Sequence, residues 1–163
     1  MSGSPVGRPL SKLSAPMVDD MQHTVGTRLA KADYRYTGSR KSLVGILATA
    51  GQPLSMPAIL AAARLPQSSA YRNLTVLENA GVVRRIITHD DFCRYELAED
   101  LTGHHHHLVC ENCGLVEDFT LSKGLEESLE SALAKTASKR GLAVVGHRVD
   151  VYGLCQECQD RRK

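Results

Sequence analysis

Three consecutive stretches in the first half of the chain place apolar residues at the spacing of a helix. They span residues 43–50, 56–64 and 69–80, and each has apolar positions three or four residues apart. Such positions lie on one face of a helix, so each stretch predicts a helix with one buried side. A less regular pattern over Met21–Ala32 predicts a helix before these three.

Residues that favour the ends of helices flank the three stretches. Ser, Thr and Asn side chains cap the exposed N–H groups at a helix start, proline is tolerated in the first turn, and glycine ends helices. The sequence therefore predicts caps at Thr37 or Ser39, Ser55 (with Pro57 in the first turn) and Ser68, and stops at Gly51 and Gly81.

Two short β-branched stretches follow the third helix. Residues 82–87 and 92–97 alternate in the manner of strands and are separated by the polar residues 88–91, which predicts a β-hairpin. Three helices followed by a hairpin form the order of a winged helix, whose helix-turn-helix core places its second helix in a DNA major groove.

The second half of the chain has a different pattern. Residues 104–109 and 115–119 predict strands, residues 122–140 predict a helix with Leu125, Leu129 and Leu133 on one face, and residues 142–151 predict a third strand. The result is a small α/β unit whose antiparallel strands could extend across a two-fold dimer.

These patterns define an α/β (α+β) chain of two ordered domains. The expected parts are a disordered Ser-, Pro- and Gly-rich tail at 1–20, a winged-helix DNA-binding domain at 21–98, a polar hinge at 99–103 and a metal-binding dimerisation domain at 104–163.

Charge separates the same two halves. The whole chain of 163 residues carries a formal net charge of only +2, but residues 1–94 total +6 and residues 95–163 total −4. A basic first half and an acidic second half rich in His and Cys suggest a polyanion binder joined to a cation binder. No apolar run approaches the ~20 residues of a membrane span, so no membrane partner is expected.

Two C-x-x-C pairs supply the chemistry for a metal site. Cys110 with Cys113, and Cys155 with Cys158, provide the four thiolates of a closed tetrahedral zinc site. Gly114 permits the positive-φ turn of a zinc knuckle. Disulfides or free thiols are the alternative, although no secretory signal precedes the domain and cytosolic thiols seldom pair.

Four consecutive histidines precede the first C-x-x-C pair. In a strand, His104 and His106 point to one face and His105 and His107 to the other, so one strand could serve two metal sites. A tag or a solvated polar strand would give the same composition without binding a metal.

The outer face of the third helix carries candidate DNA contacts. Arg72 can donate two hydrogen bonds to guanine or phosphate, and Tyr71 can reach a phosphate or a thymine methyl group. The alternative is that Tyr71 packs against its own domain and Arg72 is only solvated.

At this point the chain resembles the ferric uptake regulator family of bacterial metal-sensing repressors, over about Tyr34 to Cys158. The motifs that carry the resemblance are Arg35-Tyr36-Thr37-x-x-Arg40, Ser69-Ala70-Tyr71-Arg72-Asn73-Leu74, Ala80-Gly81-Val82-Val83, His104 to Val109 with Cys110-x-x-Cys113-Gly114, and Tyr152-Gly153-x-Cys155-x-x-Cys158.

The resemblance implies a cytoplasmic, homodimeric, metal-dependent repressor of metal uptake or homeostasis genes that binds AT-rich inverted repeats in double-stranded DNA. The DNA-contact residues it implies, together with those argued above, are Arg35, Ser68, Ser69, Tyr71 and Arg72. The metal sites it implies are a structural Zn²⁺ at Cys110, Cys113, Cys155 and Cys158, a sensor site at Glu96, His105, His107 and Asp118, and a further site at His104 or His106, Glu126 (Glu127 in a shifted register) and His147.

The sequence departs from the family in one ligand position. Many iron-type members have a histidine before the second helix of the helix-turn-helix, where this chain has Gln52-Pro53-Leu54; His89, Cys93 or Glu99 could compensate. Imidazoles with carboxylates suit Fe²⁺ and Zn²⁺, and also Mn²⁺ and Ni²⁺, so the sensed ion stays open.

Two other functions fit parts of the sequence. A zinc-dependent metalloenzyme or metal-handling protein could use the histidines, but H-E-x-x-H and G-x-S-x-G motifs are absent and the basic half would have no role. A redox protein could use C-x-x-C, but no βαβ pattern surrounds either pair. We therefore expect a regulator without catalytic residues.

Overall fold

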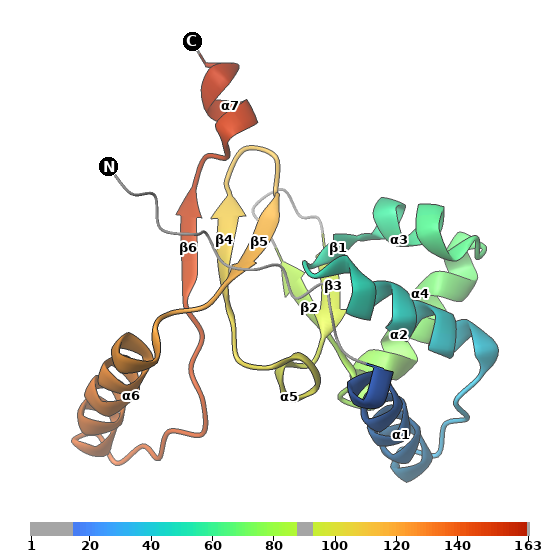
Figure 1. Cartoon of the computed structure of the whole chain (residues 1–163), viewed down its shortest axis with the longest axis horizontal. Helices are drawn as coiled ribbons and strands as arrows, with labels where there is room; N and C mark the ends of the chain where they lie inside the picture. Colours follow the sequence, from blue (N-terminus) through green and yellow to red (C-terminus); the bar gives the residue numbers. More distant parts are fainter. Residues whose placement is uncertain (1–14, 88–92, 163) are drawn as a thin grey trace.

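The computed structural model describes residues 15–87 and 93–162, which form two halves joined by one turn of helix (Figure 1). The first half contains α1 (Ala15–Lys31), α2 (Gly38–Ala50), β1 (Leu54–Ser55), α3 (Met56–Ala63), α4 (Gln67–Asn79), β2 (Val83–Ile87) and β3 (Cys93–Leu97). The second contains α5 (Glu99–Thr102), β4 (His106–Cys110), β5 (Val116–Phe119), α6 (Lys123–Ser138), β6 (Asp150–Gly153) and α7 (Gln156–Asp160).

The first half is a winged helix. Its sheet has the order β1-β3-β2, and β2 pairs antiparallel with β3, which confirms the predicted hairpin strands; the turn between them lies outside the described residues. The predicted inward residues of α4, Ala70, Leu74 and Leu77, are buried in one core with α1, α2 and α3. Burying this apolar surface is the main stabilisation of the first half.

Most helix ends follow the predicted capping residues. Thr37 precedes α2, Gly51 ends it with φ 62°, and Ser55 Oγ accepts a hydrogen bond from Ala58 N at 3.5 Å. The cap at Ser68 is wrong, because the first helical bond of α4 closes on the carbonyl of Pro66. Proline is already extended there, so α4 starts at Gln67 and Ser68 lies inside its first turn.

The second half has a three-stranded sheet in the order β5-β4-β6. β4 pairs antiparallel with β5, as predicted, but parallel with β6, with His107 opposite Asp150. The predicted strand over 142–151 is therefore mostly wrong. Residues 142–149 alternate correctly, yet the described structure places no strand beside them, and Val145 is fully exposed.

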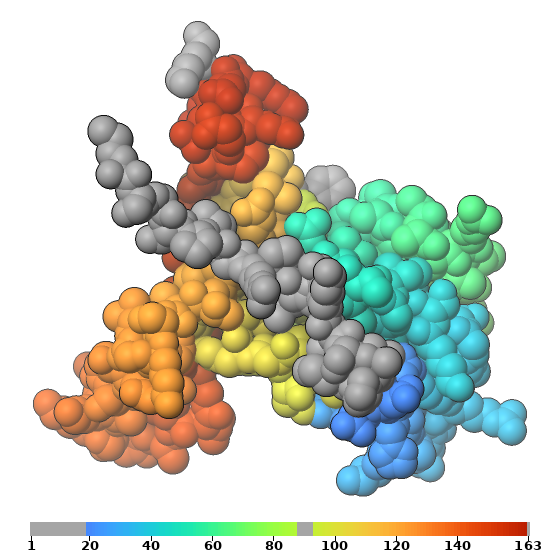
Figure 2. Space-filling view, viewed as in Figure 1, coloured from blue at the N-terminus to red at the C-terminus, as the bar shows by residue number. Residues whose placement is uncertain are grey.

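Three further boundaries differ from the prediction. The polar hinge forms the short helix α5, α7 follows Cys155 without having been predicted, and α1 begins at Ala15 within the segment assigned to the tail. Residues 1–14 of that tail lie outside the described structure. Figure 2 shows α6 as a lobe separate from the helices of the first half. None of the helices within residues 15–87 and 93–162 combines the length and the apolar character needed to span a bilayer.

The hinge is tied to the first half by one arginine. Arg28 on α1 donates to the carbonyl of Gly81 at 2.6 Å and forms an ion pair with Asp100 on α5. Because Gly81 follows α4, this side chain connects the hinge to the end of the candidate recognition helix.

Candidate metal centres and nucleic-acid interface

Three groups of His, Cys, Asp and Glu side chains that could hold a metal ion come together in the described structure, and within each group the candidate ligand atoms lie within 4.8 Å of one another. We call them the thiolate cluster (Cys110, Cys113, Cys155, Cys158), the sensor cluster (Glu96, His105, His107, Asp118) and the second cluster (His104, His106, Glu126, His147).

The thiolate cluster joins two turns that are distant in the sequence. Cys110 ends β4, and Gly114, with φ 68°, turns the chain back toward β5. Cys155 caps α7, and the Sγ atoms of Cys113 and Cys155 are 3.7 Å apart, too far for a disulfide. The cysteines are free thiols in the structure.

The pKa values of the thiols show that the cluster does not hold four thiolates together without a cation. Burial disfavours the Cys110 thiolate, but hydrogen bonds from the N–H groups of Cys155, Cys113 and Asn112 outweigh it and lower the pKa of Cys110 to about 6. At Cys113 a hydrogen bond from the N–H of Leu115 favours the thiolate, yet burial and the neighbouring sulfurs raise its pKa to about 12. Four thiolates at this spacing need a positive charge, and the donor set fits Zn²⁺.

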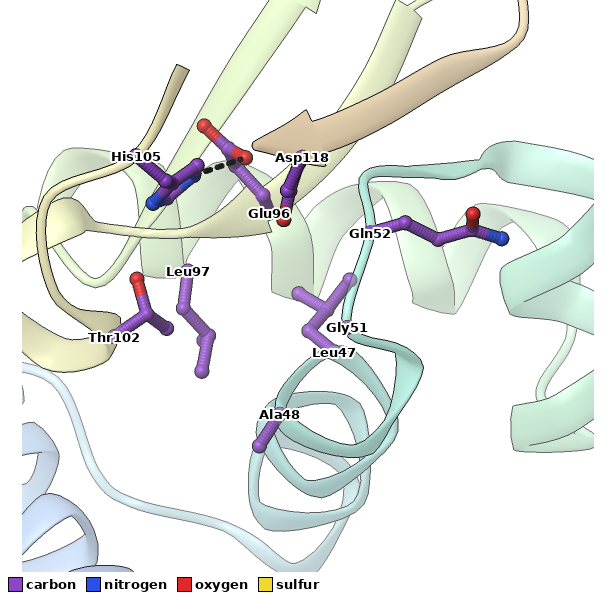
Figure 3. Close-up of a pocket in the computed structure, with 9 residues that line it drawn as sticks. All are labelled: Leu47, Ala48, Gly51, Gln52, Glu96, Leu97, Thr102, His105 and Asp118. Carbon is purple, nitrogen blue, oxygen red and sulfur yellow. Dashed lines mark hydrogen bonds and ion pairs between the residues drawn. The ribbon is translucent and has the colours of Figure 1, made fainter. Parts of the chain in front are cut away.

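The sensor cluster joins the two halves of the molecule. Glu96 comes from β3 of the winged helix, whereas His105, His107 and Asp118 come from the second half. Glu96 Oε2 lies 3.2 Å from the Nε2 atoms of both His105 and His107, and His107 Nε2 lies 3.9 Å from Asp118 Oδ1. Figure 3 shows Glu96, His105 and Asp118 converging beside a small cavity that α2 closes from below.

The other nitrogen of each imidazole is held by the protein. His105 Nδ1 is 2.9 Å from the carbonyl of Gly103, and His107 Nδ1 is 3.0 Å from Asp150 Oδ1. Such contacts fix the tautomer and turn Nε2 toward a common ligand position. Sequence reasoning did not identify Asp150, because the predicted strand over 142–151 placed it near the strand's end and gave no sign that it pairs with His107.

Acidic and basic side chains of this cluster lie in contact and shift one another's pKa values. Burial alone would raise the pKa of Glu96, but hydrogen bonds from His105, His107 and Arg84 hold it well below its usual range. The bond to Glu96 raises the pKa of His105 to about 9, although burial opposes this. Burial raises the pKa of Asp118 to about 6, and its buried Oδ1 atom makes no hydrogen bond. An orphaned carboxylate oxygen beside two Nε2 atoms fits a cation site.

The second cluster is built around one carboxylate. Glu126 on α6 contacts three imidazoles through their Nε2 atoms, those of His104 and His106 at 3.0 Å and that of His147 at 2.7 Å. His147 Nε2 is buried but makes no well-oriented hydrogen bond there, as expected of an atom directed at a shared centre. Glu126 takes this position, while Glu127 is exposed and pairs with Lys123.

Of the three residues proposed as compensating ligands, the two that the structure describes do not join the sensor cluster. Cys93 lies outside it, Glu99 contacts His104 instead, and His89 lies outside the described residues. Gln52, at the missing histidine position, lines the adjoining cavity. Arg84, which pairs with Glu96, was not singled out from the sequence, and the register that places the two opposite each other was not visible there.

The candidate nucleic-acid face is formed by α4 and the loop before α2, and none of its candidate contact residues belongs to one of the three clusters. Tyr71 and Arg72 project from α4, and Tyr71 is 46% exposed. Ser68 and Arg35 are also exposed, and Ser69 is half-buried. Arg40 bonds both Asn73 of α4, at 3.1 Å, and the carbonyl of Arg35, so it fixes the loop before α2 against this face.

Two bacterial regulators are similar to part of this sequence. The chain is 35% identical to the peroxide operon regulator of Bacillus subtilis over 94 residues, which are 58% of this chain and 59% of that protein, and 33% identical over 94 residues to a peroxide-responsive repressor of Staphylococcus saprophyticus. Both relatives are regulators rather than enzymes by name.

Solved structures confirm the arrangement of the fold. The ferric uptake regulator of Helicobacter pylori superposes with a TM-score of 0.69 at 24% identity, covering 87% of this chain and 93% of that one. The manganese-containing regulator of Pseudomonas aeruginosa gives a TM-score of 0.63 at 25% identity, covering 80% and 96%. The model of the ferric uptake regulator family matches residues 31–152, and the chain therefore belongs to that family.

Proposed function

We propose that this protein is a metal-responsive DNA-binding transcription regulator. The observation that carries the proposal is the sensor cluster, because its ligands come from both halves and only one of them, Glu96, belongs to the winged helix. A set of ligands shared between two bodies supports a role in fixing the angle between them.

The sensor residues would act as a clamp. A divalent cation would be held by the four residues of the sensor cluster and would keep β3 fixed against β4 and β5. Because β3 belongs to the winged helix, the direction of α4 would be fixed as well. The switch requires that the cation bind the closed arrangement more tightly than the open one, because equal affinity for both would shift nothing.

A homodimer is part of the proposal. The outward side of α6 and the segment after it carry exposed apolar side chains, and β6 lies at the edge of its sheet. The exposed apolar residues include Leu125, Leu133, Leu142, Val144, Val145 and Val151. Apolar surface exposed over α6, the segment after it and β6 supports an interface here. A two-fold dimer would present two copies of α4 to an inverted repeat, expected to be AT-rich.

The DNA contacts are assigned to the face that is free of metal ligands. Arg35, Ser68, Ser69, Tyr71 and Arg72 would bind phosphates and base edges, and the charge of +6 on residues 1–94 would supply the salt-dependent part of the affinity. A regulator of this kind is expected in the cytoplasm and has no need of a membrane partner.

Two versions of this function differ in the signal that the protein detects and in the genes that it regulates. Control of metal uptake or homeostasis through Fe²⁺ or Zn²⁺ is our first proposal, with Mn²⁺ and Ni²⁺ compatible with the same ligands. A response to peroxide is the second, and the two named peroxide regulators at 33–35% identity favour it. Loss of DNA binding after peroxide treatment of the Fe²⁺-loaded but not the Zn²⁺-loaded protein would identify the second version.

Operator binding tests the proposal directly. A duplex selected from random DNA would be titrated at fixed salt with Zn²⁺, Fe²⁺ or Mn²⁺ added to protein whose thiolate cluster is filled. Glu96→Ala and His105→Ala should lose metal activation while keeping the cysteine-bound zinc, whereas Arg72→Ala should lose DNA binding with unchanged metal content. If His147→Ala abolishes activation and His105→Ala does not, sensing belongs to the second cluster.

A further inference from the structure

Two residues outside the metal clusters, Arg84 and Glu99, connect the sensor cluster to the second cluster by direct contacts. We infer that this connection couples the two sites, so that a divalent cation in one weakens binding of a divalent cation in the other. The inference rests on the proposed function in one respect, namely that both clusters bind cations.

The connection runs through both oxygens of each carboxylate. Glu96 directs Oε2 at His105 and His107, and Oε1 at Arg84 Nε, 2.5 Å away. The same guanidinium reaches Glu99 Oε2 through Nη1 at 3.7 Å, and Glu99 Oε1 contacts His104 Nδ1. Every step is therefore a contact between oppositely charged or hydrogen-bonding atoms.

The last step leads into the second cluster. His104 uses Nε2 to contact Glu126 Oε1 at 3.0 Å and Nδ1 to contact Glu99. A carboxylate on the far nitrogen orients a metal-binding imidazole and makes it a better electron donor. Glu99 is thus a positioning residue for the second cluster, in the way that Asp150 is for His107.

Arg84 is shared between two carboxylates in a partly enclosed place. The side chains of Arg84 and Glu99 are 28% and 31% exposed, Glu96 is 7% exposed, and Arg84 Nη2 is buried without a hydrogen-bond partner. Partial burial strengthens charge interactions relative to water. A change in the charge of Glu96 therefore alters the interaction of Glu99 with the Arg84 guanidinium that contacts both carboxylates.

The sign of the coupling follows from this sharing. A divalent cation on Glu96 Oε2 neutralises that carboxylate and repels the guanidinium, so Arg84 interacts more strongly with Glu99. Glu99 is then a weaker acceptor for His104 Nδ1–H, which makes His104 a poorer ligand. By linkage the effect is reciprocal: filling the second cluster must weaken the sensor cluster by the same factor.

A double-mutant cycle with Zn²⁺ measures the coupling without DNA. Full-length protein with a filled thiolate cluster is titrated with Zn²⁺ in competition with a chelator, which gives the zinc affinity of the second cluster. The measurement is made with the sensor cluster present and after His105→Ala has removed it. The step of the titration that is lost in His147→Ala belongs to the second cluster. We expect His105→Ala to strengthen zinc binding at the second cluster about fivefold or more. In a Glu99→Gln background, the same truncation should change it about twofold or less, the remainder being direct repulsion between the ions.

Asp100→Asn is the matched control. It removes the neighbouring carboxylate of the same short helix, which pairs with Arg28 rather than Arg84, and should leave the coupling at its original size. Independent binding at the two clusters, tighter binding at one when the other is filled, or undiminished coupling in Glu99→Gln would each overturn the inference. Absence of zinc from both clusters would overturn it together with the metal-responsive function, whereas independent sites would leave that function standing.

Discussion

The two halves of this molecule are stabilised in different ways. The winged helix has a continuous apolar core that includes fully buried residues of every long helix, such as Val25, Leu43, Ile59 and Leu77. In the second half the buried apolar residues of the described structure are few, and next to Val109 and Val116 the buried side chains are mainly histidines and cysteines. The first half is stabilised mainly by burial of hydrocarbon, and we expect the second half to depend on ions bound at its clusters.

This difference suits the proposed function, which combines a fixed DNA-binding surface with a metal-dependent shape. A hydrophobic core is insensitive to ions, so α4 keeps its structure whether or not metal is present. The clusters, in contrast, gather thiolates, imidazoles and carboxylates whose protonation and pairing must change when a cation binds. Metal is therefore expected to control the second half and the joint, and to leave the winged helix intact.

The largest expected effect is loss of the thiolate cluster. Cys110→Ser removes a buried ligand where apparent zinc binding contributes ~10–16 kcal/mol to folding in small zinc modules. We expect the second half to unfold and the dimer to dissociate while the helical signal of the first half persists, as measured by circular dichroism, zinc content and sedimentation. Cys93→Ser, outside the cluster, should do neither. A zinc-free dimer of native stability would contradict the assignment.

The next largest effect is expected in the first half, where stability comes from the apolar core and not from a bound ion. Leu74 is 1% exposed, so Leu74→Ala should lower the free energy of unfolding by about 2–5 kcal/mol through lost burial and a residual cavity. Urea denaturation at fixed zinc should show this loss in the helical transition, with metal content per folded chain unchanged. Ile87→Ala, at a side chain 72% exposed, should cost no more than about 0.5 kcal/mol.

The same contrast explains what the sequence could predict. Helices α2 to α4 and the hairpin were predictable because each buries a regular apolar face against the others. Residues 142–149 have an equally regular strand pattern, but no neighbouring strand accepts them in the described chain, and a pattern cannot show whether a partner exists. The cysteine and histidine groupings were predictable from spacing and alternation, whereas Asp150, Arg84 and Glu99 depend on strand register and hinge geometry, which local sequence does not specify.

A third prediction concerns pH at the joint between the halves. In protein that keeps its thiolate-bound ion but has an empty sensor cluster, the pKa of His105 is raised from 6.5 to about 9. Its bond to Glu96 therefore stabilises the closed arrangement fully below pH 6.5, and this stabilisation is lost as the pH rises through about 9. Glu96, with a lowered pKa, contributes above about pH 4.5 and loses its contribution only in strong acid.

A metal ion bound at the sensor cluster should reverse this dependence of stability on pH. A cation at the sensor cluster requires neutral imidazoles, so its binding releases protons and strengthens as the pH rises. Thermal unfolding between pH 6.5 and 9 should show falling stability for the empty form and rising stability for the Zn²⁺-loaded form. His105→Ala should reduce both slopes, and His107, whose pKa is also raised, should account for the remainder. Parallel slopes in the two forms would show that His105 does not hold this proton.

The smallest effect tests whether the first half is independent of the clusters. Ser55 caps α3 with its hydroxyl, whereas Thr37 precedes α2 without a side-chain hydrogen bond to it. Ser55→Ala should therefore cost about 1 kcal/mol, and Thr37→Ala close to nothing. The cost of Ser55→Ala, measured by urea denaturation of the helical transition, should be the same with the sensor cluster empty and filled, because effects at distant sites add. A cost that grows with bound metal would mean that α3 belongs to the same cooperative unit as the clusters, and that the division between a core-stabilised half and a ligand-stabilised half is drawn in the wrong place.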